Sequence, residues 1–195
     1  LADFVALADR TGAMLLIDEA HATGIFGPDG RGLASMLDGR DDVIALRTCG
    51  KALGCEGALI LCPAVVRDFL INRGRSFIFS TAPSPLMAAV VRGALRILQS
   101  EPQRQQRLHM LVEHAATAFG GLGISSSGSP IQPIVIGNEE DTMRIAAAIQ
   151  AQGFDVRGIR PPTVLVGTSR LRITLTLNTD TAAVSALAET LERLL

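Results

Sequence analysis

The stretch Met14-Leu15-Leu16-Ile17-Asp18-Glu19-Ala20-His21 determines the expected fold of the first part of the chain. Four consecutive apolar residues are too short a run for a helix and suit a strand buried on both faces, and the polar residues from Asp18 onward end it. Two similar runs follow, Val43 to Leu46 and Gly57 to Cys62, and Pro63 stops the second of them. These runs predict strands of one sheet.

The neighbouring segments indicate the class of fold. Val65 to Ile71 has the pattern of a short helix, and Phe77-Ile78-Phe79 has that of a further strand. Alternation of short strands with helices predicts an α/β domain around a mostly parallel sheet. In such sheets, functional residues collect beyond the carboxyl ends of the strands. The polar residues in that position are Asp18, His21, Thr48 and Lys51.

The rest of the chain predicts a second, smaller domain. Helical patterns cover residues 84–98, 103–119, 139–153 and 181–195, and strand patterns cover residues 131–136, 154–159 and 171–177. This order is typical of a small α+β domain. We place the expected boundary inside the long helical region, with residues 1–97 in the large domain and residues 98–195 in the small C-terminal one.

Composition limits the class of protein. A hydrophobic fraction of 48% and a charged fraction of 19% suit a globular protein with a substantial core. The net charge of −1 gives no electrostatic reason to expect nucleic acid or an anionic membrane as a partner. The three cysteines have no zinc-site spacing, so we expect no metal and a reducing cytoplasm. Because Leu1 already lies in a helical pattern, we expect the chain to be the C-terminal part of a longer protein.

Lys51 is the most informative single residue. Lysine and arginine together number 18, and Lys51 is the only lysine among them. Arginine stays protonated at any working pH, whereas a lysine amine can lose its proton and become a nucleophile. The alternative is a lysine that persists on the surface by chance, since surface lysines are common.

The polar residues at the strand ends match the needs of a pyridoxal cofactor. Such a cofactor needs an amine to hold it, a carboxylate to keep the pyridine nitrogen protonated, and donors for its ring oxygen and phosphate. Lys51, Asp18, His21 and Thr48 can supply these groups in that order. Each has a plain alternative: Asp18 as a helix cap, His21 as a structural histidine, and Thr48 as the end of a strand.

A helicase-type ATPase is the competing interpretation from another class. An apolar strand followed by Asp-Glu-Ala-His is also the box that holds magnesium through the nucleotide in such enzymes. That function needs a phosphate loop ending in Gly-Lys-Ser or Gly-Lys-Thr, but Gly50-Lys51 is followed by Ala52. The near-neutral charge also argues against a nucleic-acid motor.

Five separated motifs carry a resemblance to a known family. They are Asp18-Glu19-Ala20-His21-Ala22-Thr23-Gly24 with Gly27 and Gly30-Arg31-Gly32, Thr48-Cys49-Gly50-Lys51-Ala52-Leu53-Gly54, Phe79-Ser80-Thr81-Ala82-Pro83-Ser84-Pro85, Arg160-Pro161-Pro162-Thr163 and Gly167-Thr168-Ser169-Arg170-Leu171-Arg172. In this order they resemble the C-terminal half of the α-oxoamine synthase family of fold-type-I pyridoxal-phosphate enzymes. The similarity covers essentially the whole chain.

The resemblance implies a role for each matching residue. Lys51 would form the Schiff base with pyridoxal 5'-phosphate, Asp18 would face the pyridine nitrogen, and His21 would lie beside the ring hydroxyl. Thr48 would contact the phosphate. Ser80 and Thr81 match the stretch that reaches the phosphate of a neighbouring subunit, and Thr163 and Arg172 match substrate-contacting residues, Arg172 holding the amino-acid carboxylate.

The resemblance also implies a reaction and its partners. The last motif best matches the member that condenses L-alanine with pimeloyl-CoA or pimeloyl-acyl carrier protein in biotin biosynthesis, as a cytoplasmic homodimer with shared active sites. Other members use glycine with acetyl, succinyl or long-chain acyl thioesters. Cys55-Glu56 and Leu165 depart from the family pattern, which puts the fine substrate preference in doubt. Residues 1–195 alone are not expected to catalyse, because the cofactor-stacking side chain and the glycine-rich phosphate contacts lie upstream.

Overall fold

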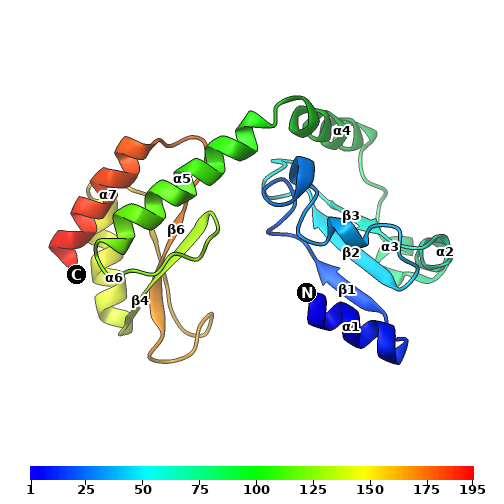
Figure 1. Ribbon diagram of the computed structural model, residues 1–195, viewed down its shortest axis with the longest axis horizontal. Coiled ribbons are helices and arrows are strands. Elements are labelled where there is room, and N and C mark those ends of the chain that lie inside the picture. The colour runs from blue at the N-terminus through cyan, green and yellow to red at the C-terminus, as the bar shows by residue number, and fades with distance from the viewer. The chain divides into compact units, whose positions relative to one another are not determined.

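The computed structural model describes residues 1–195 and divides them into two compact units. The first comprises Leu1–Gln105 and the second Gln106–Leu195. Each unit contains its own sheet with helices around it (Figure 1). We describe each unit by itself. The boundary expected at residues 97 and 98 stays a prediction about the domains of the full-length protein.

The first unit is built on a mixed three-stranded sheet of order β1-β2-β3. Its strands are β1 (Leu15–Asp18), β2 (Val43–Thr48) and β3 (Ala58–Leu61). β1 pairs with β2 in parallel, while β3 pairs with β2 antiparallel. The short loop of residues 49–57 explains the antiparallel pair, because a parallel connection needs a longer crossover.

Helices precede and follow the strands of the first unit. They are α1 (Ala2–Thr11), the short 3₁₀ helices η1 (Pro28–Gly30) and η2 (Ser35–Leu37), then α2 (Ala64–Arg73), α3 (Arg75–Ile78) and α4 (Pro85–Ser100). The strand expected at Phe77-Ile78-Phe79 is wrong. Phe77 and Ile78 both donate their backbone N–H to the Gly74 carbonyl, as in a helical turn. Three apolar residues in a row are too few to fix a period, so their composition misleads here.

The second unit has an antiparallel sheet of order β4-β6-β5. Its elements are α5 (Gln103–Gly120), β4 (Ile131–Gly137), α6 (Glu139–Gln150), β5 (Arg157–Ile159), β6 (Ser169–Thr174) and α7 (Thr181–Leu194). The helices bury one face each: Phe119 of α5, Ile149 of α6 and Leu191 of α7 are at most 1% exposed. None of the helices in the chain has the length and apolar character needed to span a membrane.

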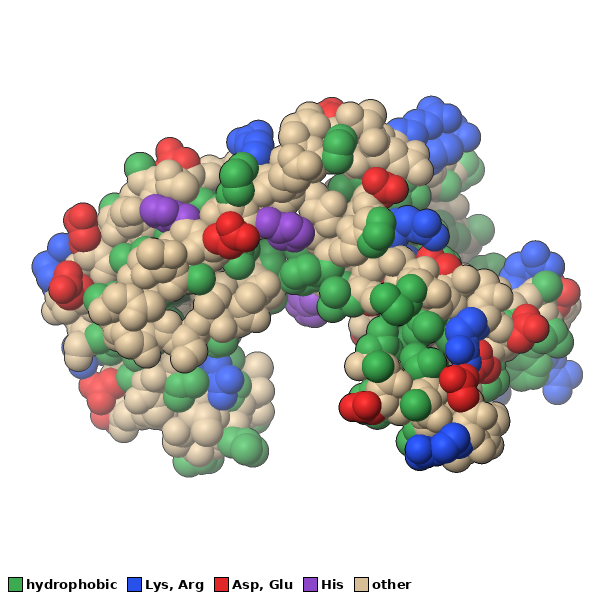
Figure 2. Space-filling model, viewed as in Figure 1, with side chains coloured by type: hydrophobic (Ala, Val, Ile, Leu, Met, Phe, Trp, Pro, Cys, Tyr) green, Lys and Arg blue, Asp and Glu red, His purple; other side chains and the backbone are tan.

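The surface of the first unit carries many large apolar side chains. Leu16 on β1 is 77% exposed and Phe79 after α3 is 78% exposed. Figure 2 shows hydrophobic side chains gathered over β1. Contiguous apolar surface is typical of sites where protein, membrane or ligand binds.

Candidate functional site

The site begins at the edge of the first sheet where β1 and β2 both end. The parallel register sets Asp18 opposite Leu46, and the N–H of Glu19 donates to the Leu46 carbonyl at 2.8 Å. Thr48 ends β2 two residues further on. Because neighbouring strands lie about 4.8 Å apart, Asp18 and Thr48 share this edge. The backbone therefore places Asp18 and Thr48 at the same end of the sheet, where the sequence predicts polar residues.

A tight turn follows β1 and carries His21. One Asp18 carboxylate oxygen accepts the Ala20 N–H at 2.8 Å. The Glu19 carbonyl accepts the Ala22 N–H at 3.0 Å, and both the N–H and the hydroxyl of Thr23 at 2.9 Å. The His21 side chain is exposed at the middle of this turn. Asp18 is an exposed residue, so its carboxylate is accessible to a group that donates a hydrogen bond.

A closely bonded loop follows β2 and carries Lys51. The Thr48 hydroxyl accepts the Gly50 N–H at 3.3 Å, and the Lys51 carbonyl accepts the Gly54 N–H at 2.9 Å. Cys55 closes the loop by donating its N–H to the Cys49 carbonyl at 2.8 Å. Lys51 lies exposed in this loop and forms no ion pair. Its amine is therefore available to a ligand.

Cys49 anchors this loop in the core. Its side chain is 1% exposed and packs with Leu53 and Val91. Burial raises the pKa of the Cys49 thiol, and the neighbouring Cys55 raises it further. A thiol with a raised pKa is a poor nucleophile and a poor metal ligand, so the burial of Cys49 fits a role in packing.

Two further predicted site residues, Ser80 and Thr81, follow α3. Both side chains are exposed, and the Ser80 hydroxyl donates to the Ser76 carbonyl at 2.5 Å. Neither forms a hydrogen bond with the residues at the sheet edge. The structure therefore shows them accessible but does not assemble them with Lys51.

The two predicted substrate residues belong to the second unit. Thr163 is exposed in a turn in which its N–H donates to the Arg160 carbonyl at 3.1 Å. On β6, Arg172 and Arg170 lie on the face opposite the buried Leu171, as strand alternation predicts. The two arginines differ in their availability to a ligand. Arg170 donates its Nε–H to the Thr168 carbonyl at 3.0 Å, whereas the Arg172 side chain is exposed.

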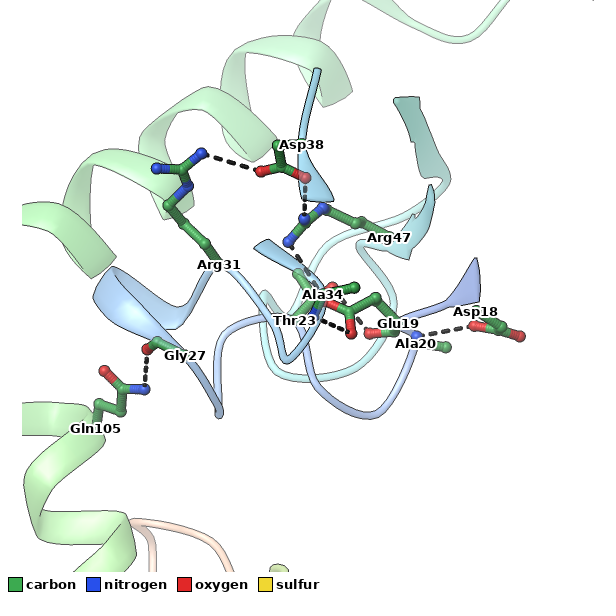
Figure 3. A network of polar contacts seen from close by, with 10 residues as sticks. All are labelled: Asp18, Glu19, Ala20, Thr23, Gly27, Arg31, Ala34, Asp38, Arg47 and Gln105. Atoms are coloured by element: carbon green, nitrogen blue, oxygen red, sulfur yellow. Dashed lines mark hydrogen bonds and ion pairs between the residues drawn. The ribbon is translucent and has the colours of Figure 1, made fainter. Parts of the chain in front are cut away.

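Sequence reasoning gave no role to a buried charged network beside the site. Glu19 is 3% exposed and Arg47 is 6% exposed. Arg47 Nη1 lies 3.7 Å from Glu19 Oε2, and its Nη2 lies 2.9 Å from Asp38 Oδ1 (Figure 3). A signal exists in the sequence: Arg47 follows Val43 and Ala45 at the alternate, buried positions of β2. A charge at such a position requires a buried partner.

Comparisons with known proteins identify the family. The family model described as Aminotransferase class I and II matches residues 1–191. An 8-amino-7-oxononanoate synthase of Anaeromyxobacter dehalogenans (strain 2CP-C) is 43% identical over 198 residues, which is 98% of this chain and 50% of that protein. One of Bordetella petrii is 39% identical, over 100% of this chain and 50% of that protein. The chain spans about half the length of the curated relatives it matches.

Solved structures show the same fold. The crystal structure of 8-amino-7-oxononanoate synthase from Francisella tularensis superposes with a TM-score of 0.83 at 23% identity, over 99% of this chain and 58% of that one. The serine palmitoyltransferase of Sphingomonas wittichii gives a TM-score of 0.88 at 22% identity, over 98% of this chain and 49% of that one. The architecture is therefore that of the fold-type-I pyridoxal-phosphate transferases.

Proposed function

Since the chain belongs to the aminotransferase class I and II family, we propose that it is the lysine-bearing half of an 8-amino-7-oxononanoate synthase. The reaction is the decarboxylating condensation of L-alanine with a pimeloyl thioester in biotin biosynthesis. The observation that carries the proposal is the placement of Lys51. Lys51, the only lysine of the chain, is exposed in the hydrogen-bonded loop that follows β2. The end of β2 lies beside Asp18, the last residue of β1.

The side chains at this edge fit pyridoxal 5'-phosphate. An amine without an ion-pair partner, an exposed carboxylate, an exposed imidazole and a strand-end hydroxyl are the groups that such a cofactor needs. They come from Lys51, Asp18, His21 and Thr48. When bound, the cofactor supplies an electron sink for the carbanion formed at the α-carbon of an amino acid.

Each of these residues then has a defined task. Lys51 Nζ would hold the cofactor and would serve as the general base that takes the α-proton of the amino acid. The Asp18 carboxylate would accept a hydrogen bond from the pyridine nitrogen and favour its protonated form. His21 would hydrogen bond to the ring oxygen, and the Thr48 hydroxyl would donate to the phosphate.

The substrates and the second subunit complete the proposal. Arg172 holds the alanine carboxylate with two parallel hydrogen bonds, and Thr163 contacts the substrate. Ser80 and Thr81 reach the phosphate in the neighbouring subunit of a cytoplasmic homodimer. In the full-length protein, residues 1–97 complete a large domain begun upstream, and residues 98–195 form the small one.

The substrate assay tests this function directly. Full-length protein loaded with pyridoxal 5'-phosphate is offered L-alanine or glycine, each with pimeloyl-CoA, pimeloyl-acyl carrier protein, acetyl-CoA, succinyl-CoA or palmitoyl-CoA. Mass spectrometry of the products should show 8-amino-7-oxononanoate from alanine and one of the pimeloyl donors. Condensation with glycine but not with alanine would show that the protein is another α-oxoamine synthase. Absence of condensation with every pair would contradict the proposal.

A further inference from the structure

Glu19 connects three parts of the first unit. Its N–H donates to Leu46 on β2, and its carbonyl holds the turn around His21 through Ala22 and Thr23. Its carboxylate reaches further along the chain, where Oε1 accepts the Ala34 N–H at 3.0 Å. One buried residue therefore links the end of β1, the turn after it and the segment that leads to η2.

Arg47 meets this residue from the neighbouring strand. Its guanidinium lies between the carboxylates of Glu19 and Asp38, and Arg31 contacts the second oxygen of Asp38 at 2.9 Å (Figure 3). Arg47 directly precedes Thr48 and lies four residues before Lys51. The pair therefore joins the strand that leads to the lysine with the turn that carries the histidine.

The space for the Glu19 carboxylate depends on Gly32. A Cβ atom at this position would lie 1.5 Å from Glu19 Oε2 and 3.1 Å from Arg47 Nη1. Gly32 also has a φ of 91°, which side-chain-bearing residues rarely adopt. The buried carboxylate therefore lies directly against the backbone of Gly32, and a side chain at position 32 would displace it.

The pair is held by charge more than by hydrogen bonds. Glu19 Oε2 and Arg47 Nε have no hydrogen-bond partner, although both are buried. Two buried charges at 3.7 Å are poor contributors to stability, because desolvation offsets most of their attraction. Removing Arg47 alone is costly, because Glu19 then stays buried without a counter-charge, whereas Arg47 without Glu19 keeps the Asp38 carboxylate at 2.9 Å. Such a pair can fix how two segments pack against each other while it adds little to the free energy of folding.

We propose that Glu19 and Arg47 are positioning residues whose buried ion pair fixes the turn carrying His21 against the end of β2. The turn and the strand end hold the two sets of cofactor residues, so the pair sets their relative placement. That consequence for the cofactor rests on the function proposed above, whereas the packing of the turn does not.

Hydrogen–deuterium exchange of the full-length protein without added cofactor tests the packing. Arg47→Met keeps the length of the side chain and removes its charge. The amides of residues 20–34 should exchange about tenfold faster in this variant, on the scale of losing one charged contact. The double variant Glu19→Gln/Arg47→Met should restore part of the protection, because no buried charge is left unpaired. Arg47→Gln, which also removes the charge, provides the same measurement if the methionine variant does not fold.

A matched control is available at the other end of β2. Arg40→Met removes ion pairs with Asp42, at 2.7 Å, and with Asp9, just before the strand begins. It should leave the exchange of residues 20–34 unchanged. Equal loosening in Arg40→Met, unchanged exchange in the Arg47 variants, or a double variant that is worse than Arg47→Met would each overturn the proposal.

A second measurement follows the effect to the cofactor. In loaded full-length protein, the pH midpoint of the visible absorption should shift by about half a unit or more in Arg47→Met, since a displaced neighbour changes the stabilisation of a charged group. Glu19→Gln should shift it as well, and Arg40→Met should not. If the wild type shows no visible absorption with the cofactor, the proposed function fails, and the exchange measurement still decides whether the pair positions the turn. An unshifted midpoint in both variants, with a normal wild-type spectrum, would overturn the link to the cofactor.

Discussion

Lys51 stands where arginine fills almost every other basic position of the chain. Its proposed task is one that arginine cannot perform, because a guanidinium keeps its proton and does not act as a nucleophile at working pH. The structure adds that the residue is exposed and free of ion pairs, which is the state required of an amine that must bond to a ligand.

Asp18 is the residue whose role is easiest to separate from a structural one. Asp18→Asn preserves the shape and can still accept the Ala20 N–H, so the turn should remain. The negative charge opposite the pyridine nitrogen is lost, and we expect the turnover of the full-length protein to fall by roughly 10²-fold or more. Steady-state kinetics with alanine and the thioester measures this. Asp41→Asn, a change at another exposed carboxylate, should have no effect, and near-normal turnover in Asp18→Asn would reduce Asp18 to a turn cap.

Arg172 and Arg170 provide a matched pair on one strand. Arg172→Lys replaces a forked group by a single ammonium and should weaken the alanine-induced change in the cofactor spectrum by about 1.5–3 kcal/mol. Arg170→Lys should do little, because that side chain already bonds to the Thr168 carbonyl. Titration with alanine compares the two variants. The reverse order of effects would place the carboxylate site elsewhere.

Residue-scale prediction from the sequence was limited by what a one-dimensional pattern can show. Asp18 and Thr48 were proposed because they lie at or just beyond the end of a short apolar run, and Lys51 because it is the only lysine of the chain. Glu19 and Arg47 were given no role, because the identity of each residue's partner depends on the register of β1 against β2.

At the scale of elements, long helical patterns and apolar runs of four or more residues predicted the structure, whereas a run of three residues did not. The helix expected to begin after Asn138 is α6, and the pattern at Val184, Leu187 and Leu191 is the buried face of α7. The three-residue strand expected at Phe77-Ile78-Phe79 is wrong. The direction of β3 was also out of reach of periodicity, since it follows from the length of the preceding loop.

The start of α6 gives a test at this scale. The Asn138 side chain accepts the Asp141 N–H at 3.0 Å and so satisfies one free donor at the helix end. Asn138→Ala should lower the free energy of unfolding by about 1 kcal/mol. Urea unfolding of the full-length protein, followed by circular dichroism, measures the loss. Asn178→Ala is the control, since α7 is capped by Asp180 instead; an equal loss in both variants would show that the cap contributes nothing.

At the scale of the whole molecule, the chain provides part of a site. The exposed apolar side chains of the first unit and a length near half that of its relatives agree with a molecule completed by further protein. The cofactor proposal therefore concerns the assembled, full-length enzyme, in which the amine of Lys51 is the one group that bonds to the cofactor.

Borohydride fixation tests that central claim most directly. Full-length protein is incubated with pyridoxal 5'-phosphate, reduced with borohydride, digested and analysed by mass spectrometry. The account predicts that the pyridoxyl group is fixed on the peptide containing Lys51 and that Lys51→Arg, which keeps the charge, loses the fixation. Fixation on a different lysine of the full-length protein, or equal fixation in Lys51→Arg, would contradict it.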